Sequence, residues 1–458
     1  MKKILISELL IIPAVLYASS HIRDPFIFII FLNIALWVLF TTLLTVVFLK
    51  LFLRGKRLSA ISAIFVIIIF LLIIFRSGIH IFIQAPADER LKSLPYLTWA
   101  PVQGENSQKT GVTKYNRKLS WEGVNIYNSR NLPAAYLIDM SGNVLHTWSA
   151  KINQEDSWQQ IKYRGDGDLL AMVKDKLLIR LDWNSKVKWF SKMRFHHDMD
   201  VDRDEKIWVL ARRDEVVFIS GIPVPILNDY IVVLSPDGKI EREVSFFKLL
   251  KNEVKADRII SIYHYILSPD FIISLLKRKI KGEPVLGEEE YLFDIFHANA
   301  IEVIDQDIPG VCRKGDLLIS LRNLDLIGIV DIRKEKLIWS WGKNNLSRQH
   351  HPTLLKNQNI LVFDNGCQRR YSRVVEINPR TNKIEWEYKA SPPERFFSEG
   401  SGSSQRLPNG NTLITESDSG YVFEITPGGE MVWEFYNPQI RKESNSRAVI
   451  YRMLRMRM

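Results

Sequence analysis

The stretch Glu430-Met431-Val432-Trp433 decides the fold, because it is one copy of a motif that recurs along the chain. The motif is a turn followed by a polar residue, an aliphatic residue, one further residue and usually Trp. The earlier copies end at Trp148, Trp189, Arg242, Trp339 and Trp386. Successive copies lie 41, 53, 97, 47 and 47 residues apart. A period in the forties with several short strands per unit is typical of a β-propeller blade.

The spacing of 97 residues is about two periods and contains a region, about 246–286, of helical and loop character. We interpret this region as an insertion on one face of the propeller. Six copies of the motif then predict an all-β fold, a six-bladed β-propeller over residues 120–458. We expect a linker at 85–119 before it.

Residues 1–84 have the composition of a membrane anchor. Pro25–Leu49 carries no charge, and Leu58–Phe75 is an uncharged run of 18 residues, so both are long enough to cross a bilayer. A shorter run at about 4–20 contains Glu8 and Pro13. It is either a retained helix, which we favour, or a signal peptide cleaved after small residues. We therefore predict two or three transmembrane helices, at about 4–20, 25–49 and 58–82.

The basic residues predict the topology. Lys2-Lys3 and the cluster Arg54–Arg57 should both face the cytoplasm, whereas the loop at 21–24 is nearly neutral. The C-terminal domain is then extracytoplasmic, on a multi-pass protein of the inner (cell) membrane. In that compartment Cys312 and Cys367 could pair.

The charge distribution argues against a nucleic-acid partner. The net charge is +11, but residues 1–84 carry eight basic and two acidic residues, and residues 441–458 carry six and one. The 356 residues between them are neutral in sum, which argues against a basic groove for a phosphate backbone. Two cysteines are too few for a disulfide scaffold or a cysteine-rich zinc site.

Histidines recur at a corresponding place in three blades. A turn before the second strand of a blade begins at Lys356 in one copy and at Arg203 in another, and six residues upstream are His350 and His197. The blade between them has His297, sixteen residues before its turn, which requires a loop lengthened by ten residues. Innermost strands line the channel of a propeller, so we expect these three imidazoles to converge.

Three interpretations of the histidines remain open: structural residues, a three-histidine zinc site with an open position, and catalysis by imidazole. We favour catalysis and expect no metal and no cofactor. Asn299 lies two residues after His297, so in a strand both face the same side. Arg322 follows the next strand of that blade and offers a fork of donors to an oxyanion. This set of residues suits a sulfate or phosphate group.

Several strings resemble the bacterial arylsulfate sulfotransferase family (arylsulfotransferases, ASST). They are His196-His197-Asp198, His297-Ala298-Asn299, Gln349-His350, Phe363-Asp364-Asn365-Gly366 and Gln405–Leu413, within about residues 120–452. The resemblance implies a six-bladed propeller that moves sulfate from a phenolic sulfate ester to a phenol. It implies a ping-pong mechanism through a sulfated histidine, without a nucleotide donor.

The resemblance also implies roles for individual residues. His350 is the expected nucleophile, and Arg322 is expected to clamp the oxyanion. His297 and Asn299 are expected to bind sulfate and stabilise charge. The remaining candidates, for contacts to sulfate or phenol, are His197, His196 and His351.

We therefore expect a membrane-anchored, extracytoplasmic aryl sulfotransferase whose partners are an aryl sulfate donor and a phenolic acceptor. The alternative is a non-catalytic propeller of the cell envelope that binds a ligand or protein. A quinone-dependent dehydrogenase is a distant third, because its metal-ligating acids are not found in the inner strands. The histidines and Arg322 must meet in one place for the first interpretation to stand.

Overall fold

The computed structural model describes residues 22, 24–35, 98–102, 106, 108–152, 157–254, 256–282, 286 and 292–457. The membrane helices predicted at about 4–20 and 58–82 lie outside these residues, and of the helix predicted at 25–49 only Pro25–Ala35 is described, as a helix. The chain divides into two compact units. The first contains Met1–Ser93, Arg213–Asn228 and Leu250–Ile295, and the second contains Leu94–Arg212, Asp229–Leu249 and Phe296–Met458.

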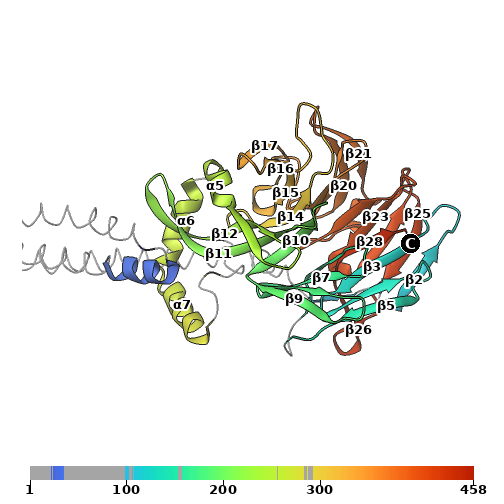
Figure 1. The fold of residues 1–458 in the computed structure, drawn as a ribbon, viewed down its shortest axis with the longest axis horizontal. Coiled ribbons are helices and arrows are strands. Elements are labelled where there is room, and N and C mark those ends of the chain that lie inside the picture. The colour runs from blue at the N-terminus through green and yellow to red at the C-terminus, as the bar shows by residue number, and fades with distance from the viewer. Residues whose placement is uncertain are drawn as a thin grey trace, which may run out of the picture. The chain divides into compact units, whose positions relative to one another are not determined.

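Six antiparallel sheets follow one another along the described chain (Figure 1). The first has β3 (Val124–Ser129), β4 (Ala134–Ile138), β5 (Val144–Ser149) and the C-terminal β28 (Ile450–Met456). The second has β6 (Gln160–Tyr163), β7 (Leu169–Val173), β8 (Leu177–Leu181) and β9 (Val187–Lys192). The third has β10 (Phe195–Val201), β11 (Ile207–Ile219), β12 (Ile222–Leu234) and β13 (Ile240–Ser245).

The other three sheets repeat this order of strands. The fourth has β14 (Ala298–Val303), β15 (Leu317–Leu321), β16 (Leu326–Asp331) and β17 (Lys336–Trp341). The fifth has β18 (His350–Leu354), β19 (Ile360–Asp364), β20 (Arg373–Asn378) and β21 (Lys383–Tyr388). The sixth has β22 (Ser403–Arg406), β23 (Thr412–Glu416), β24 (Tyr421–Ile425), β25 (Met431–Tyr436) and β2 (Gly111–Tyr115).

Neighbouring sheets contact one another through their first strands. In turn, β6 contacts β10, β10 contacts β14, β14 contacts β18, β18 contacts β22, and β22 contacts β28 of the first sheet. The order of sheets therefore forms a propeller-like ring, in which each sheet stays open. The prediction of an all-β domain built from repeated short sheets is confirmed.

The sequence of each strand matches its place in this ring. The second strand of the second sheet, Leu169–Val173, is a continuous apolar run, and all five of its residues are buried because both faces pack against a neighbouring sheet. The fourth strand carries the repeated Trp motif and alternates exposed and partly buried residues, as in Lys336–Trp341. Trp148 and Trp433 are fully buried in the cores between sheets.

The C-terminal strand closes the ring. Strand β28 pairs with β3 in antiparallel register, with Met453 opposite Tyr127. Its cations are buried: Arg455 pairs with Glu424 and donates to Asn125 Oδ1 at 2.7 Å, and Arg452 pairs with Asp198. The two cations of β28 are therefore part of the core.

Two segments depart from the sequence-based expectations. The linker expected at 85–119 contributes β2 to the sixth sheet and β1 (Trp99–Pro101) to a small sheet with β26 (Ile440–Arg441) and β27 (Ser446–Ala448). Strands β11 and β12 have 13 residues each, much longer than the other strands. Short helices occur at α5 (Phe246–Leu250), η2 (Lys251–Glu253), η3 (Arg322–Leu324), η4 (Pro393–Arg395), η5 (Ser417–Ser419) and η6 (Lys442–Ser444).

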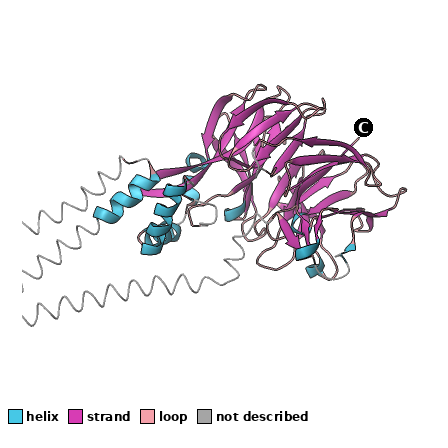
Figure 2. Cartoon of the chain, turned by 90° about the horizontal axis from the view of Figure 1, so that it is seen from below, coloured by secondary structure: helices cyan, strands magenta, loops and turns pink. Residues whose placement is uncertain are grey.

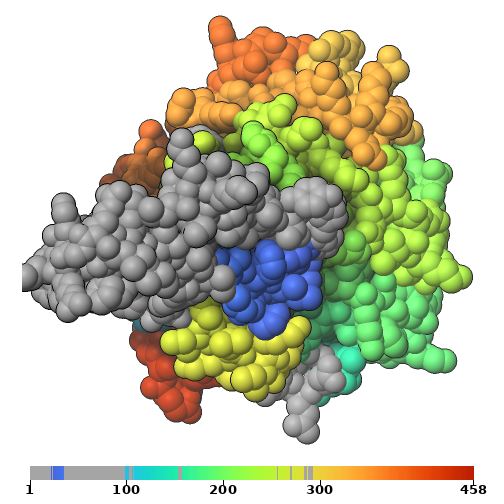
Figure 3. All heavy atoms as spheres, turned by 90° about the vertical axis from the view of Figure 1, so that its left-hand side faces the viewer, coloured from blue at the N-terminus to red at the C-terminus, as the bar shows by residue number. Residues whose placement is uncertain are grey.

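The first unit is where the described long helices occur, within the predicted insertion and near the N-terminus (Figure 2). Helix α6 (Ala256–Ile266) is followed by α7 (Pro269–Lys281), which begins with a Ser268 cap and ends at Gly282 in the left-handed conformation. Helix Pro25–Ala35 lies against them (Figure 3), and Asn33 Nδ2 donates to Ile266 O at 3.0 Å.

Within the described residues, no single helix is long and apolar enough to cross a membrane. One bent pair, Ala256–Ile266 with Phe271–Lys281, passes the same test of length and composition when taken together, with a bend of 75°.

Candidate active site

The predicted histidines lie on the inner strands β10 and β18 and directly before the inner strand β14. Each strand is followed by a turn with a backbone hydrogen bond: Asp202 N–H to Lys206 O (3.0 Å), Ile304 N–H to Asp316 O (2.9 Å) and Leu355 N–H to Asn359 O (2.8 Å). His197 lies five positions before Asp202, and His350 lies five positions before Leu355. These two histidines therefore occupy equivalent places in the ring.

His297 does not occupy the equivalent place, which corrects the sequence-based register. Leu355 and Asn359 are four positions apart, whereas Ile304 and Asp316 are twelve apart, so this loop is eight residues longer rather than ten. The residue five positions before Ile304 is Asn299. His297 lies two positions earlier, just before β14 begins.

The backbone nevertheless brings His297 to His197. Both residues have a left-handed backbone, with φ of 49° for His297 and 59° for His197, and the register of β10 and of β14 shifts nearby. Such bulges redirect side chains at the ends of strands. The two Nε2 atoms lie 3.2 Å apart, and both side chains are buried.

A row of polar contacts runs from a buried carboxylate through three imidazoles. Asp229 Oδ1, on β12, lies 3.2 Å from His196 Nε2 in an ion-pair contact that is poorly directed for a hydrogen bond. His196 Nδ1 lies 2.7 Å from His197 Nδ1, and His197 Nε2 faces His297. Asp229 Oδ2 also accepts from Ala298 N–H at 2.8 Å.

One assignment of tautomers agrees with this row when all three rings are neutral. With a proton on His196 Nε2, facing the carboxylate, His196 Nδ1 accepts from His197 Nδ1–H. His197 Nε2 then accepts from His297 Nε2–H. Burial lowers the pKa of His197 and of His297 well below the ordinary value, and neighbouring cationic groups lower both further.

His350 is held in one tautomer by two acceptors. Its Nδ1 donates to Asn365 Oδ1 at 2.8 Å and to Arg348 O at 3.1 Å. The Asn365 amide cannot turn over without loss, because its Nδ2 donates to Ser398 O (2.7 Å) and Ser401 O (3.1 Å). The proton therefore lies on His350 Nδ1, and Nε2 keeps a lone pair.

The surroundings also keep His350 neutral. Burial, and then the positive charge of Arg322, lower its pKa to about 3, although the hydrogen bond to Asn365 acts in the opposite direction. An imidazole that is neutral with an unprotonated Nε2 is a nucleophile at neutral pH and needs no base to remove a proton.

Arg322 supplies the positive charge of this site. It begins the short helix η3 directly after β15, its side chain is buried, and its backbone N–H donates to His297 O at 3.0 Å. Its charge lowers the pKa of both His297 and His350. His197 and His297 are thus in contact, Arg322 is bonded to the backbone of His297, and its charge acts on both His297 and His350.

Gln349 and Asn299 join the fourth and fifth sheets beside His350. Gln349 Nε2 donates to Ser320 Oγ (2.9 Å) and Leu326 O (2.9 Å), and Gln349 O accepts from Asn299 Nδ2 at 2.8 Å. One amide N–H of Asn299 is therefore used to position the backbone next to His350. Only its second N–H can serve a bound anion.

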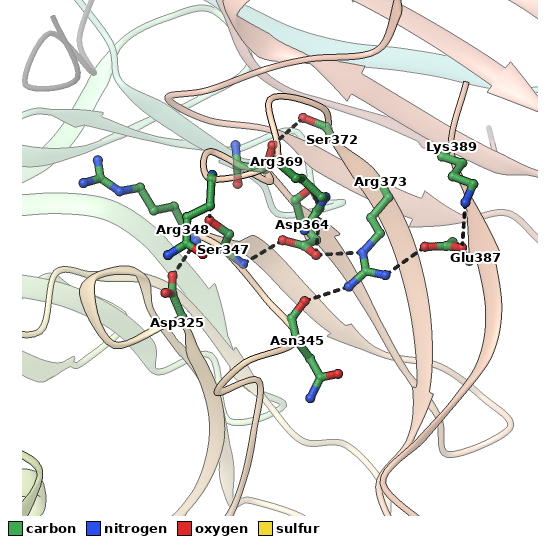
Figure 4. Close-up of polar contacts among 12 residues, drawn as sticks. Asp325, Asn345, Ser347, Arg348, Asp364, Arg369, Ser372, Arg373, Glu387 and Lys389 are labelled. Atoms are coloured by element: carbon green, nitrogen blue, oxygen red, sulfur yellow. Dashed lines mark hydrogen bonds and ion pairs between the residues drawn. The ribbon is translucent and has the colours of Figure 1, made fainter. Parts of the chain in front are cut away.

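Two carboxylates anchor the segment that leads into His350 (Figure 4). Ser347 N–H donates to Asp364 Oδ1 at 2.9 Å, and Arg348 N–H donates to Asp325 Oδ1 at 2.7 Å. Asp364 is itself paired with Arg369 and Arg373. The string Asp364-Asn365 thus has two tasks: the first residue fixes the backbone before His350, and the second orients its ring.

His351 belongs to different surroundings. Burial lowers its pKa well below the ordinary value, and the next contributions come from Arg452 and Lys162 rather than from Arg322. Arg452 and Lys162 are paired with Asp198 and Asp200 on the inner strands. The two adjacent histidines therefore face different groups, and the site with Arg322 contains His350.

Sequence reasoning missed Asp229 and assigned no role to Gln349 or Asn365. Gln349 and Asn365 lie within the strings that carried the family resemblance, so their position beside His350 was a usable signal. Asp229 lies in the long strand β12, 32 positions after His197, and its only local signal is a charged residue in an apolar strand.

The zinc interpretation finds no site in the described residues, where no three His, Cys, Asp or Glu side chains come together as metal ligands. Cys312 and Cys367 are both free and buried, so the possible disulfide does not form. Burial raises the pKa of each thiol to about 11.

The profile of the family described as Arylsulfotransferase (ASST) matches residues 175–438, more than half of the chain and all of the residues just described except Arg452, Lys162 and the C-terminal strand. The chain belongs to the arylsulfotransferase family. A search of curated proteins found no match to this chain.

Solved structures resemble this chain only weakly. A protein of unknown function from Bacteroides caccae is 12% identical, with a TM-score of 0.48 over 74% of this chain and 100% of its own. Virginiamycin B lyase from Staphylococcus aureus is 12% identical, with a TM-score of 0.41 over 75% and 89%. A Dos1 propeller is 11% identical, with a TM-score of 0.37 over 73% and 77%.

Proposed function

We propose that this arylsulfotransferase moves a sulfuryl group from an aryl sulfate to a phenol through His350. The observation that carries the proposal is the state of His350: it is neutral, its Nδ1–H donates to Asn365 Oδ1 and Arg348 O, and the positive charge of Arg322 acts on it. Further support comes from Asn299, which donates to the carbonyl of Gln349 next to His350, and from the contact between His197 and His297.

The first half-reaction begins with attack by the His350 Nε2 lone pair on sulfur. The N–S bond forms as the S–O bond to the aryl group breaks, and the phenolate leaves with the electron pair. In the second half-reaction the oxygen of a phenol attacks sulfur and the N–S bond breaks. The proton lost by the acceptor phenol balances the one taken up by the released phenolate, so no cofactor is consumed.

Charge stabilisation is the task of Arg322 and the neighbouring donors. The sulfuryl group carries negative charge on its oxygens throughout the transfer, and a buried guanidinium offers fixed donors in a water-poor site. His297 and the second N–H of Asn299 are suited to the remaining oxygens. Asp229 and His196 do not contact the sulfuryl group in this proposal. They set the tautomer of His197, which in turn sets the tautomer of His297.

Intact-mass measurement tests the proposal. The full chain in detergent is mixed with an aryl sulfate and no acceptor, and we expect a gain of one sulfuryl group that disappears when a phenol is added. His350→Ala should remove both adduct and turnover. His351→Ala is the matched control, because it removes the adjacent imidazole that faces Arg452, and it should keep the adduct. Binding of aryl sulfate without any adduct or turnover would instead favour a non-catalytic propeller.

We further propose that the enzyme is a six-bladed propeller anchored in the inner membrane and facing the periplasm. Its support is the two uncharged runs in residues 25–49 and 58–75 and the basic residues Arg54–Arg57 between them. A reporter that is active only in the cytoplasm, fused to the C-terminus, should remain silent. An active reporter would contradict this topology.

A further inference from the structure

Helix α7 is apolar on two faces, and only one of them is covered. Phe271 and Leu275 are buried, and Phe271 packs against Phe293 with ring centroids 5.5 Å apart. On another face, Ile273 is 52% exposed and Ile280 is 86% exposed, with the exposed Leu276 between them. These three residues follow the i, i+3, i+7 spacing of one helix stripe.

The exposed stripe is surrounded by positive charge. Lys277, Lys279 and Lys281 are exposed on the same half of α7, together with the partly buried Arg278, and no acidic residue occurs between Phe271 and Lys281. An apolar stripe flanked by lysines is the pattern of a helix that lies in the interface of an anionic membrane. Helix α6 adds Ile260, which is 70% exposed.

The contacts of these helices connect them to the segment predicted to enter the bilayer. Helix Pro25–Ala35 is the described beginning of the uncharged run that ends at Leu49. The Lys279 ammonium lies 5.1 Å from the Phe26 ring, and Asn33 donates to Ile266 O. Figure 3 shows this blue helix directly against the yellow residues of α7.

The directions of the helices agree with an interfacial position. In Figure 1, α6 and α7 run across the direction of Pro25–Ala35. If that helix enters a bilayer along its normal, the helices that cross it lie parallel to the membrane plane. The predicted topology also places Pro25 at the extracytoplasmic surface of the membrane, on the same side as α6 and α7.

We propose that α6 and α7 form a lipid-binding surface that lies flat in the outer interface of an anionic bilayer. Ile273, Leu276 and Ile280 enter the acyl boundary, and the lysines contact phosphate headgroups. The proposal goes beyond sulfate transfer but depends on the proposed membrane anchor, so its test must distinguish the two.

Labelling at Ile280 provides that test. A single environment-sensitive fluorophore is attached to Ile280→Cys in the full chain, which is reconstituted into nanodiscs of phosphatidylglycerol and phosphatidylcholine carrying nitroxide on the acyl chains. Cys312 and Cys367 are only 7% exposed, so they label poorly. The matched control is Phe190→Cys on β9, where the side chain is 55% exposed. We expect lipid quenching at position 280 and quenching by aqueous iodide at position 190.

The outcomes separate the surface from the anchor. In one outcome the protein enters nanodiscs, but iodide quenches the label at position 280 as strongly as the label at position 190. This outcome would overturn the lipid-binding surface alone. A protein that never enters nanodiscs would overturn the anchor and the surface together. Shielding of position 280 in detergent, accompanied by dimer formation, would assign the stripe to a second copy of the chain.

A charge variant tests the headgroup contact. For Lys277→Gln in nanodiscs that contain phosphatidylglycerol, the ratio of lipid-inserted to aqueous label at position 280 should fall about fivefold. The same variant should behave like the parent in phosphatidylcholine alone. Equal effects in both lipids would contradict a role for anionic headgroups.

Discussion

Replacing Asn365 with Asp would change the charge state of His350 in a measurable way. The pKa of His350 is about 3 because burial and Arg322 disfavour the imidazolium. Compared with an ordinary histidine, at 6.5, protonation of this ring is penalised by about 5 kcal/mol, at about 1.4 kcal/mol per pH unit. A carboxylate in place of the amide oxygen, 2.8 Å from Nδ1, should raise the pKa by about 1–3 units.

Nitrogen NMR of histidine-labelled protein can follow this change. In the unmodified protein the His350 resonances, assigned with His350→Gln, should show the Nδ1–H tautomer and no titration between about pH 5 and 8. In Asn365→Asp the ring should begin to titrate at the acidic end of that range. The kcat/KM of the variant should fall over the same interval, because the protonated ring has no lone pair at Nε2.

The measurement that can refute this argument is the pKa and tautomer of His350 in the unmodified protein. The Asn365→Asp substitution also removes the two hydrogen bonds that the Asn365 amide donates to Ser398 O and Ser401 O, so the variant is checked for folding by near-ultraviolet circular dichroism. If His350 of the unmodified protein titrates near pH 6.5, or carries its proton on Nε2, the argument from Asn365 is wrong whatever the variant does.

Three further predictions follow from other contacts. Arg322→Gln should lower kcat about 100- to 1,000-fold in a sulfate-transfer assay while an adduct on His350 still forms slowly, and loss of less than tenfold would contradict its role. Arg455→Met should destabilise the propeller by about 3–5 kcal/mol in denaturant unfolding, because Glu424 is left buried, and adding Glu424→Gln should restore most of that loss. The free energy of unfolding should fall as the pH drops below about 6.5. The reason is that His350 in the unfolded chain binds a proton near that pH, whereas the buried ring in the folded protein binds one only near pH 3. His350→Gln should make the free energy of unfolding less dependent on pH in this range.

The repeat and the main candidate residues could be predicted from the sequence alone, because both depend on local patterns. A strand buried on both faces is often a near-continuous apolar run, and a strand with one exposed face tends to alternate, so the repeated motif marked the fourth strand of the sheets. The strings around His197, His297 and His350 sit at the ends of such strands, and that is sufficient to predict that they converge. Uncharged runs long enough for a bilayer are equally local.

Only the tertiary structure decided how these residues act. Whether His297 or Asn299 is equivalent to His350 depended on the length of one loop, which sequence spacing misjudged by two residues. The tautomer of His350 depends on a contact with Asn365, 15 residues away in the sequence, and that of His297 depends on a row of contacts through His196 and His197 to Asp229. His350 and His351 are adjacent and cannot be distinguished by sequence alone. In the structure, the charge of Arg322 lowers the pKa of His350, whereas the charge of Arg452 lowers the pKa of His351. The physical reason is that protonation and orientation follow from burial and from nearby charges, which only the assembled sheets bring together.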